Sequence, residues 1–264
     1  MVKAAEHFDV CAPFFDQLRR AKTRVLMLDY DGTLAPFTAD RTRAFPYRDI
    51  PDTVSKIMGC KTRVVLISGR AATELLFLSG IHPHPEIWGS HGAERLYPDG
   101  SYEVESPAPR QRVGLQVANR SLRSAGLTAR MEAKPGGIAV HWRGLADEEQ
   151  ASVEKKVRSL CGPLVDEYGL QLLPFDGGLE IRSPSKNKGD AVSAILAEAG
   201  AGVAAAYLGD DHTDENAFRA IKGHGLAVLV RTEPRPTMAD VWLRPPEELG
   251  HFLREWLAAC GAEK

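Results

Sequence analysis

Two aspartates stand at the end of an apolar run, with one residue between them. Val25–Leu28 leads directly into Asp29 and Asp31, and Gly32 and Thr33 follow. Residues two apart in an extended chain point the same way, so both carboxylates are expected on one face at the end of a buried strand. Two neighbouring carboxylates there can both stay ionised only beside a cation. A plain polar strand end is the alternative, but the paired acids and the following Gly-Thr do not favour it.

Further polar residues follow apolar runs later in the chain. Ser68 comes directly after one run, and Asp210 and Asp211 follow another, with Asp214 about one turn further on. Ligands of open parallel sheets bind beyond the carboxyl ends of the strands, so all these side chains are expected at one rim of one sheet. The carboxylates gathered there would suit Mg²⁺, which prefers hard oxygen ligands.

A lysine completes the set of groups that could do chemistry. Lys188 follows Asn187 at the start of a predicted helix, where a cation could offset the acids or hold an anionic substrate. Clustered acids, a divalent cation, a lysine and a hydroxyl donor are groups that stabilise phosphoryl transfer. In such sites a carboxylate can act as the nucleophile and form an aspartyl phosphate.

The elements that must position these residues alternate between strand and helix in the first and last parts of the chain. This alternation predicts an α/β fold with a Rossmann-like parallel sheet core, right-handed crossovers and helices on both faces. The expected strands are Arg24–Leu28, Arg63–Ile67, Ile87–Trp88, Val203–Leu208 and Gly225–Val230, and the expected helices are Pro51–Met58, Ala71–Leu78, Gly189–Ala199 and Asp214–Ile221, with a final helix near Pro246.

The middle of the chain has a different pattern. Two amphipathic stretches, Pro107–Ser124 and Asp147–Tyr168, are each followed by two short strands that flank a Gly-Gly turn. This order predicts an antiparallel α+β module inserted in the parallel-sheet domain. We expect the insert at residues 106–183 and the discontinuous core at residues 1–105 and 184–264. The expected hairpin strands are Leu127–Lys134, Ile138–Arg143, Leu170–Phe175 and Leu179–Arg182.

Composition excludes several classes of protein. Of the 264 residues, 44% are hydrophobic and 26% are charged, which is typical of a globular protein. A formal net charge of −2 gives no general attraction to nucleic acid, and no apolar run approaches the roughly 18–20 residues of a membrane helix. Met1–Val10 has no hydrophobic leader, and the four cysteines are widely spaced. We therefore expect a cytoplasmic monomer with reduced thiols and no nucleic-acid or membrane partner.

Four motifs, taken in order, resemble those of the haloacid dehalogenase superfamily of phosphatases. They are Asp29-Tyr30-Asp31-Gly32-Thr33, then Ser68, then Lys188, and last Gly209-Asp210-Asp211 with Asp214. Each motif alone is short, but all four lie at a predicted strand end or helix start, as in that superfamily. The resemblance therefore implies a Mg²⁺-dependent phosphatase with an aspartyl-phosphate intermediate.

The resemblance also implies roles for the catalytic residues. Asp29 would attack phosphorus. Asp31 would protonate the leaving sugar oxygen and then take a proton from the water that hydrolyses the intermediate. Ser68 would hydrogen-bond the phosphoryl group, Lys188 would neutralise it together with the nucleophile, and Thr33 would add its hydroxyl and backbone N–H.

The same resemblance implies a set of metal ligands. Mg²⁺ would be held by Asp29, by the backbone carbonyl of Asp31 and by Asp210. Asp211 and Asp214 would act through water or by orienting the lysine. The residues alone leave the division of labour between Asp29 and Asp31 open.

The insert stands in the sequence between the Ser68 and Lys188 motifs, which matches the position of the C2-type caps of this superfamily, and the resemblance implies that it would cover the active site and choose the substrate. Its predicted hairpin strands carry polar residues in i, i+2 pairs, and each pair lies on one face of its strand. The pairs are Glu132 with Lys134, His141 with Arg143, and Glu180 with Arg182. A solvated face with cross-strand salt bridges is the alternative for any single pair. Three pairs on one small sheet favour binding of sugar hydroxyls.

A finer resemblance is to the trehalose-6-phosphate phosphatases. It extends from about Arg24 to Val230 and includes the Ile67-Ser68-Gly69-Arg70 and Gly89-Ser90-His91-Gly92 segments. Contacts to the substrate implied by position are Glu132, Lys134, His141, Arg143 and Glu180, together with Gly69, Arg70 and Asn187.

The leading hypothesis is therefore hydrolysis of trehalose 6-phosphate to trehalose and phosphate, as in trehalose biosynthesis. Three alternatives stay open at this point. One is a phosphatase for another sugar phosphate, such as sucrose phosphate or mannosyl-3-phosphoglycerate. Another is a phosphosugar mutase, and the third is a catalytically silent domain that binds sugar phosphates.

Overall fold

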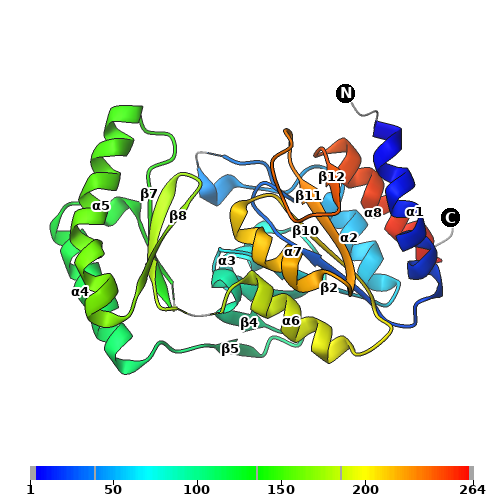
Figure 1. The fold of residues 1–264 in the computed structure, drawn as a ribbon, viewed down its shortest axis with the longest axis horizontal. Coiled ribbons are helices and arrows are strands. Elements are labelled where there is room, and N and C mark those ends of the chain that lie inside the picture. Colours follow the sequence, from blue (N-terminus) through cyan, green and yellow to red (C-terminus); the bar gives the residue numbers. More distant parts are fainter. Residues whose placement is uncertain (1–3, 39, 135, 185, 262–264) are drawn as a thin grey trace. The chain divides into compact units, whose positions relative to one another are not determined.

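The computed structural model describes residues 4–38, 40–134, 136–184 and 186–261, and side chains from residue 10 onward. The chain divides into two compact units. The first unit comprises Met1–Glu103 and Lys186–Lys264, and the second is Val104–Ser185 (Figure 1). The second unit is thus an insertion in the first.

The first unit is built on an eight-stranded sheet of order β12-β11-β10-β1-β2-β3-β4-β5. Its strands from β12 to β3 are parallel, and β4 runs antiparallel to β3. The strands are β1 (Arg24–Leu28), β2 (Thr62–Ile67), β3 (Glu86–Gly89), β4 (Glu94–Leu96), β5 (Tyr102–Val104), β10 (Ala204–Gly209), β11 (Gly225–Val230) and β12 (Val241–Leu243). The predicted parallel α/β core is confirmed.

Two apolar clusters lie on opposite faces of this sheet because successive residues of a buried strand point to opposite sides. Leu26 and Leu28 of β1 pack with α1, α2, α3 and α8. Val25 and Met27 pack with α6 and α7. These helices are α1 (Ala4–Arg20), α2 (Ile50–Gly59), α3 (Ala72–Leu78), α6 (Lys188–Ala199), α7 (Glu215–Ile221) and α8 (Glu247–Ala259).

The second unit has a four-stranded antiparallel sheet of order β6-β7-β9-β8, with α4 and α5 packed on one face. Its elements are α4 (Pro109–Ser124), β6 (Met131–Lys134), β7 (Gly137–His141), α5 (Asp147–Tyr168), β8 (Gln171–Phe175) and β9 (Gly178–Arg182). Ile138, Val140 and Leu179 lie in the apolar cluster with the helices. Glu132 and Glu180 occupy the alternate positions of their strands, so their side chains point to the other face of the sheet.

Several elements differ from the sequence prediction. Helix α1 was not predicted, although its Phe14 ring packs 5.7 Å from Trp256 of α8. Strands β4, β5 and β12 are three residues each and were also missed. A 3₁₀ turn at Thr128–Arg130 replaces the first half of the expected strand before β6.

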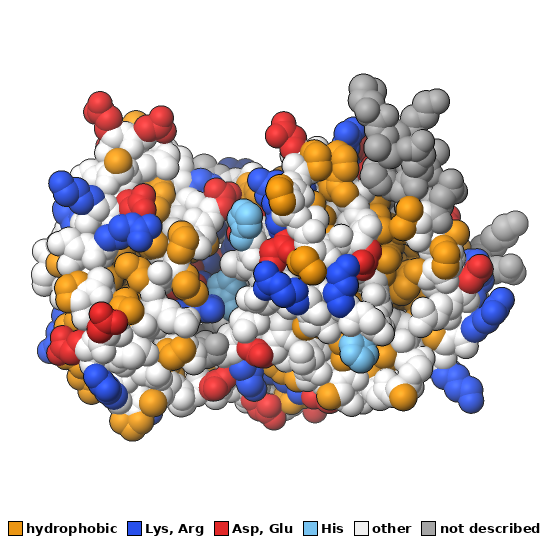
Figure 2. All heavy atoms as spheres, viewed as in Figure 1, with side chains coloured by type: hydrophobic (Ala, Val, Ile, Leu, Met, Phe, Trp, Pro, Cys, Tyr) orange, Lys and Arg blue, Asp and Glu red, His pale blue; other side chains and the backbone are white. Residues whose placement is uncertain are grey.

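The surface carries mixed charge. On the face drawn in Figure 2, basic and acidic side chains are interspersed, and apolar side chains lie among them. All four cysteines are free thiols. Among the described residues, none of the helices combines the length and apolar character needed to cross a lipid bilayer.

Candidate active site

Asp29 is a buried carboxylate at the carboxyl end of the central strand β1. Only 3% of its surface is exposed. Lys188 donates from Nζ to Asp29 Oδ1 at 2.7 Å, and the Thr33 hydroxyl donates to Oδ2 at 3.2 Å. Both oxygens are thus oriented by residues from the predicted catalytic set.

The turn after Asp29 brings its motif close to the second acidic loop. The carbonyl of Tyr30 accepts the N–H groups of Leu34 at 2.9 Å and Ala35 at 3.0 Å, which closes the turn. Gly32 has a φ of +82°, and a Cβ added there would lie 2.2 Å from Asp210 Oδ2. The backbone at residue 32 therefore lies so close to Asp210 that only glycine fits there.

Replacing Gly32 with alanine is therefore expected to displace Asp210 and to reduce activity severely, by about 100-fold or more, since a misplacement of about 1 Å has that effect in preorganised sites. Gly100 is a matched control, because its φ is +85° and an added Cβ there meets nothing within 4 Å. Gly100→Ala should cost about 1–2 kcal/mol of folding stability from the left-handed backbone alone and leave turnover unchanged. Steady-state kinetics and thermal unfolding of both variants check this. Equal activity loss in the two would contradict the role given to Gly32.

Asp210 follows β10 and lies beside Asp29 at the same rim of the sheet. Asp29, Asp210 and Asp214 each offer a carboxylate oxygen, and these oxygens lie within 4.8 Å of one another. Asp210 Oδ2 is buried and has no hydrogen-bond partner among the described residues. Among the described residues, Asp210 Oδ2 is paired with Arg231, whose Nη1 is 3.8 Å away, too far for a hydrogen bond.

The protonation of this cluster reflects its burial. Burial raises the pKa of Asp29 to about 7, although Lys188 opposes the shift, and the nearby Asp214 adds to it. Burial and the charges of Asp29 and Asp214 also raise the pKa of Asp210 well above its usual range. A divalent cation among these oxygens would favour their ionised forms. The orphaned oxygen and the all-oxygen donor set therefore fit Mg²⁺.

Lys188 is held at the first turn of α6. The Asn187 side-chain oxygen caps this helix by accepting the N–H of Gly189 at 2.8 Å, and Asp190 completes the capping box. Burial alone would lower the pKa of Lys188, but Asp214 and Asp29 raise it above its usual range. Lys188 therefore stays charged. The side-chain oxygen of Asn187, a predicted substrate contact, is engaged in the cap.

Asp214 organises the lysine and the loop after β10. Its Oδ1 accepts Lys188 Nζ at 2.6 Å, and its Oδ2 accepts the backbone N–H groups of Asp210 at 3.1 Å and Asp211 at 2.9 Å. The buried Tyr207 hydroxyl also donates to Asp214. The Asp211 carboxylate lies outside the three-acid group and instead accepts the N–H of His212 at 2.7 Å.

Ser68 lies at the end of β2, the neighbour of β1. Its N–H donates to the Trp88 carbonyl at 2.9 Å, and its hydroxyl accepts the Arg70 N–H at 3.2 Å. A Cβ on Gly69 would lie 2.6 Å from the His91 ring. His91 itself has a φ of +60°, an uncommon conformation for a residue with a side chain, and its N–H donates to the Ser68 carbonyl at 2.9 Å. The loop after β3 is therefore strained to pack against the predicted phosphate-binding segment.

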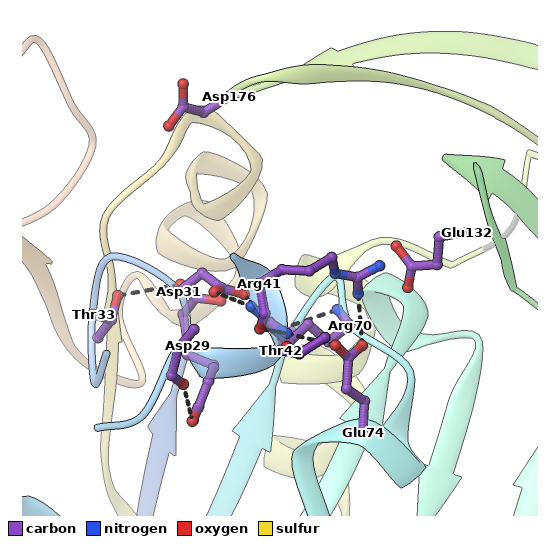
Figure 3. Close-up of polar contacts among 12 residues, drawn as sticks. Asp29, Asp31, Thr33, Arg41, Thr42, Arg70, Glu74, Glu132 and Asp176 are labelled. Atoms are coloured by element: carbon purple, nitrogen blue, oxygen red, sulfur yellow. Dashed lines mark hydrogen bonds and ion pairs between the residues drawn. The ribbon is translucent and has the colours of Figure 1, made fainter. Parts of the chain in front are cut away.

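Asp31 is bound by Arg70 through two parallel hydrogen bonds. Arg70 Nε donates to Asp31 Oδ2 at 2.6 Å, and Nη2 donates to Oδ1 at 2.7 Å. The third guanidinium nitrogen donates to Glu74 at 2.6 Å. In Figure 3, Arg41, Arg70 and Glu74 gather beside Asp31. Arg70, predicted to contact substrate, thus has its guanidinium engaged within its own unit, and sequence reasoning missed Glu74 and Arg41.

The second unit brings together most of its predicted polar residues. His141 Nε2 lies 3.0 Å from Glu132, and Lys134 Nζ lies 3.9 Å from Glu132 and 3.6 Å from Glu180. These four side chains form one cluster on the sheet face opposite the helices. Arg143 instead donates to the backbone carbonyl of Asp176 at 2.6 Å, in the turn between β8 and β9.

Comparisons with known proteins agree on one family. The trehalose-phosphatase family matches residues 27–244. A trehalose 6-phosphate phosphatase of Zea mays is 32% identical over 288 aligned positions, which cover 98% of this chain and 77% of that protein. The structure of Aspergillus fumigatus trehalose-6-phosphate phosphatase has a TM-score of 0.65 at 25% identity and covers 96% of this chain and 97% of its own.

Two further solved structures support the fold. The C-terminal domain of C. albicans trehalose-6-phosphate phosphatase has a TM-score of 0.74 at 19% identity, with 94% of this chain and 96% of that chain covered. A phosphatase of the haloalkanoate (HAD) enzyme superfamily from Bacteroides thetaiotaomicron has a TM-score of 0.60 at 18% identity, with 89% of this chain and 95% of that chain covered. The chain therefore belongs to the trehalose-phosphatase family of phosphoric monoester hydrolases.

Proposed function

We propose that this protein hydrolyses trehalose 6-phosphate to trehalose and phosphate through an aspartyl phosphate on Asp29, with Mg²⁺ as cofactor. Family membership supports the substrate, and one observation carries the mechanism: a buried carboxylate at a strand end, beside a charged lysine and two further acids. Such a group is oriented and desolvated, as a nucleophile toward a phosphoryl group must be.

In the first step, an Asp29 oxygen forms a bond to phosphorus while the bond from phosphorus to the sugar oxygen breaks. Asp31 gives its proton to that leaving oxygen. In the second step, water attacks phosphorus, Asp31 takes a proton from it, and the bond to Asp29 breaks. Lys188 balances charge on Asp29 throughout, because its ammonium is already bound to one Asp29 oxygen.

Three groups would hold the magnesium ion: the carboxylates of Asp29 and Asp210 and the backbone carbonyl of Asp31. When bound, the ion supplies Lewis-acid stabilisation of the negative charge on the phosphoryl oxygens. Asp214 would stay with Lys188, since it already binds that ammonium and two backbone N–H groups. The Ser68 hydroxyl would donate to the phosphoryl oxygens, and the Thr33 hydroxyl would continue to orient Asp29.

The second unit would serve as the cap that selects the sugar. Glu132, Lys134, His141 and Glu180 supply donors and acceptors on one sheet face, and sugar hydroxyls need both. Arg143 would add a further donor at the edge of this cluster. The cytoplasmic location and the monomeric state stay predictions from the sequence.

A substrate panel tests the proposal. Phosphate release should be fastest by a wide margin with trehalose 6-phosphate, compared with glucose 6-phosphate, sucrose phosphate and mannosyl-3-phosphoglycerate. Net release of phosphate, rather than a phosphorylated sugar isomer, separates hydrolysis from mutase chemistry. Equal turnover of all four compounds would overturn the substrate assignment, and binding without any turnover would favour a silent binding domain.

A further inference from the structure

We propose that Arg70, fixed by Glu74, is a positioning residue for Asp31 rather than a contact to substrate. This inference rests on the proposed function, because it concerns the residue that exchanges protons with the sugar oxygen and with water. It assigns a role to Glu74, which lies outside the four motifs.

The pairing of Arg70 with Asp31 is specific. Both Asp31 oxygens are bound, at 2.6 and 2.7 Å, by two nitrogens of one planar guanidinium. A two-point contact of this kind fixes the plane of the carboxylate as well as its distance. Arg70 is itself buried, with 5% of its surface exposed.

Arg70 is held in turn on its other side. Its Nη1 donates to Glu74 at 2.6 Å and to the backbone carbonyl of Arg41 at 2.8 Å. The Arg41 guanidinium donates to the second Glu74 oxygen at 2.6 Å. Arg70 is therefore anchored by Glu74 and by the backbone of Arg41, and it has little freedom to reorient.

The backbone of Arg70 belongs to the predicted phosphate-binding segment. Its N–H donates to the Ser68 hydroxyl at 3.2 Å, and its carbonyl accepts the Ser90 N–H at 2.7 Å. One residue thus links the segment that would bind the phosphoryl group to the acid that would protonate the leaving oxygen. In the proposed step, one Asp31 oxygen leaves Arg70, takes up a proton from solvent and turns to the leaving sugar oxygen, while the other stays on Arg70, so the guanidinium serves as the pivot.

The test compares two leaving groups in single-turnover experiments. The sugar oxygen of trehalose 6-phosphate must receive a proton as it leaves, whereas p-nitrophenolate leaves without one. Arg70→Met should slow release of trehalose by about 10- to 100-fold, a part of what a positioned acid contributes. The burst of p-nitrophenolate from p-nitrophenyl phosphate should change by less than about threefold, because formation of the aspartyl phosphate then needs no acid.

Two conservative variants extend the test. Arg70→Lys keeps the charge but only one contact, so it should recover part of the trehalose release. Glu74→Gln should also slow trehalose release selectively, but by a smaller factor. If Arg70→Met fails to fold, the Glu74→Gln result tests the inference in its place. Equal slowing of both substrates, or no slowing at all, in the folded variants would overturn the inference.

A matched control comes from the same unit. Arg95 is also held by two carboxylates, with its Nε 2.8 Å from Glu86 and its Nη1 2.7 Å from Glu198. Arg95→Met should lower the thermal midpoint while leaving the ratio of the two substrate rates unchanged. This separates a general loss of buried ion pairs from a loss of positioning.

Asp31→Asn distinguishes failure of the inference from failure of the proposed function. That variant should lose trehalose release and keep the p-nitrophenolate burst. If Asp31→Asn behaves in this way and the Arg70 variants do not, only the inference is wrong. If Asp31→Asn affects neither step, the role proposed for Asp31 is wrong, and the inference falls with it.

Discussion

Asp29→Asn is expected to reduce phosphate release by roughly 10⁵-fold, as loss of a nucleophile does elsewhere. The amide keeps the shape of the side chain and can still contact the Thr33 hydroxyl, which lies 3.2 Å from Asp29 Oδ2. It carries no negative charge, so it can neither attack phosphorus nor pair with Lys188. Substrate binding should survive, since the residues proposed to bind the sugar lie in the second unit.

Two measurements check this result. A colorimetric phosphate assay follows turnover, and titration calorimetry with trehalose 6-phosphate follows binding. Asp16→Asn is the control. Asp16 lies on α1, and its side chain is 58% exposed. Among the described residues, its only ion-pair partner is Arg19, about one turn away. Near-normal turnover of Asp29→Asn would show that the nucleophile has been assigned wrongly.

Removal of divalent cations with EDTA should stop turnover, and Mg²⁺ should restore it. Asp210→Asn should abolish turnover even when Mg²⁺ is present. It should also change thermal stability in two ways. The metal-free variant should unfold at a higher temperature than the metal-free wild type, because a buried unpaired oxygen and repulsion from Asp29 and Asp214 are both reduced. The same variant should lose the stabilisation that Mg²⁺ gives the wild type.

Thermal unfolding with and without Mg²⁺ measures both effects. An ion at 100 times its dissociation constant stabilises the folded state by about 2.7 kcal/mol, which is easily detected. Asp240→Asn is the control, because Asp240 accepts the Ala227 N–H at 2.9 Å and pairs with Lys222 on the exposed side of its loop. This variant should lose some stability and keep the full response to Mg²⁺. An undiminished Mg²⁺ response in Asp210→Asn would exclude Asp210 as a ligand.

Much of the fold could be predicted because its signals are local. Strand β1 and helix α5 have the predicted bounds. A short apolar run and a long amphipathic pattern can each be recognised within one continuous segment of the sequence. Three-residue strands such as β4 are too short to show a period. The strand order is also not local, because β1 pairs with β10 and β2 through contacts between distant segments.

The candidate site divides in the same way. The acids and Lys188 could be predicted, because each stands next to the end of its own strand or the start of its own helix. Their partners could not, because Glu74 lies within α3 and Tyr207 within β10. Tyr207 did leave a signal: a tyrosine after three alanines, two residues before the strand end, carries a hydroxyl that a purely apolar strand would not need.

The insertion of one unit within the other has a consequence for how the chain matures on the ribosome. Asp29 and Lys188 are separated by 159 positions. Strand β1 cannot complete its pairing until β10 has been synthesised. The second unit is continuous in sequence and has its own apolar core, so its contacts can all form before the catalytic half is fully synthesised. The nucleophile is therefore translated well before its lysine and its neighbouring acids, so a chain truncated before Lys188 would lack them.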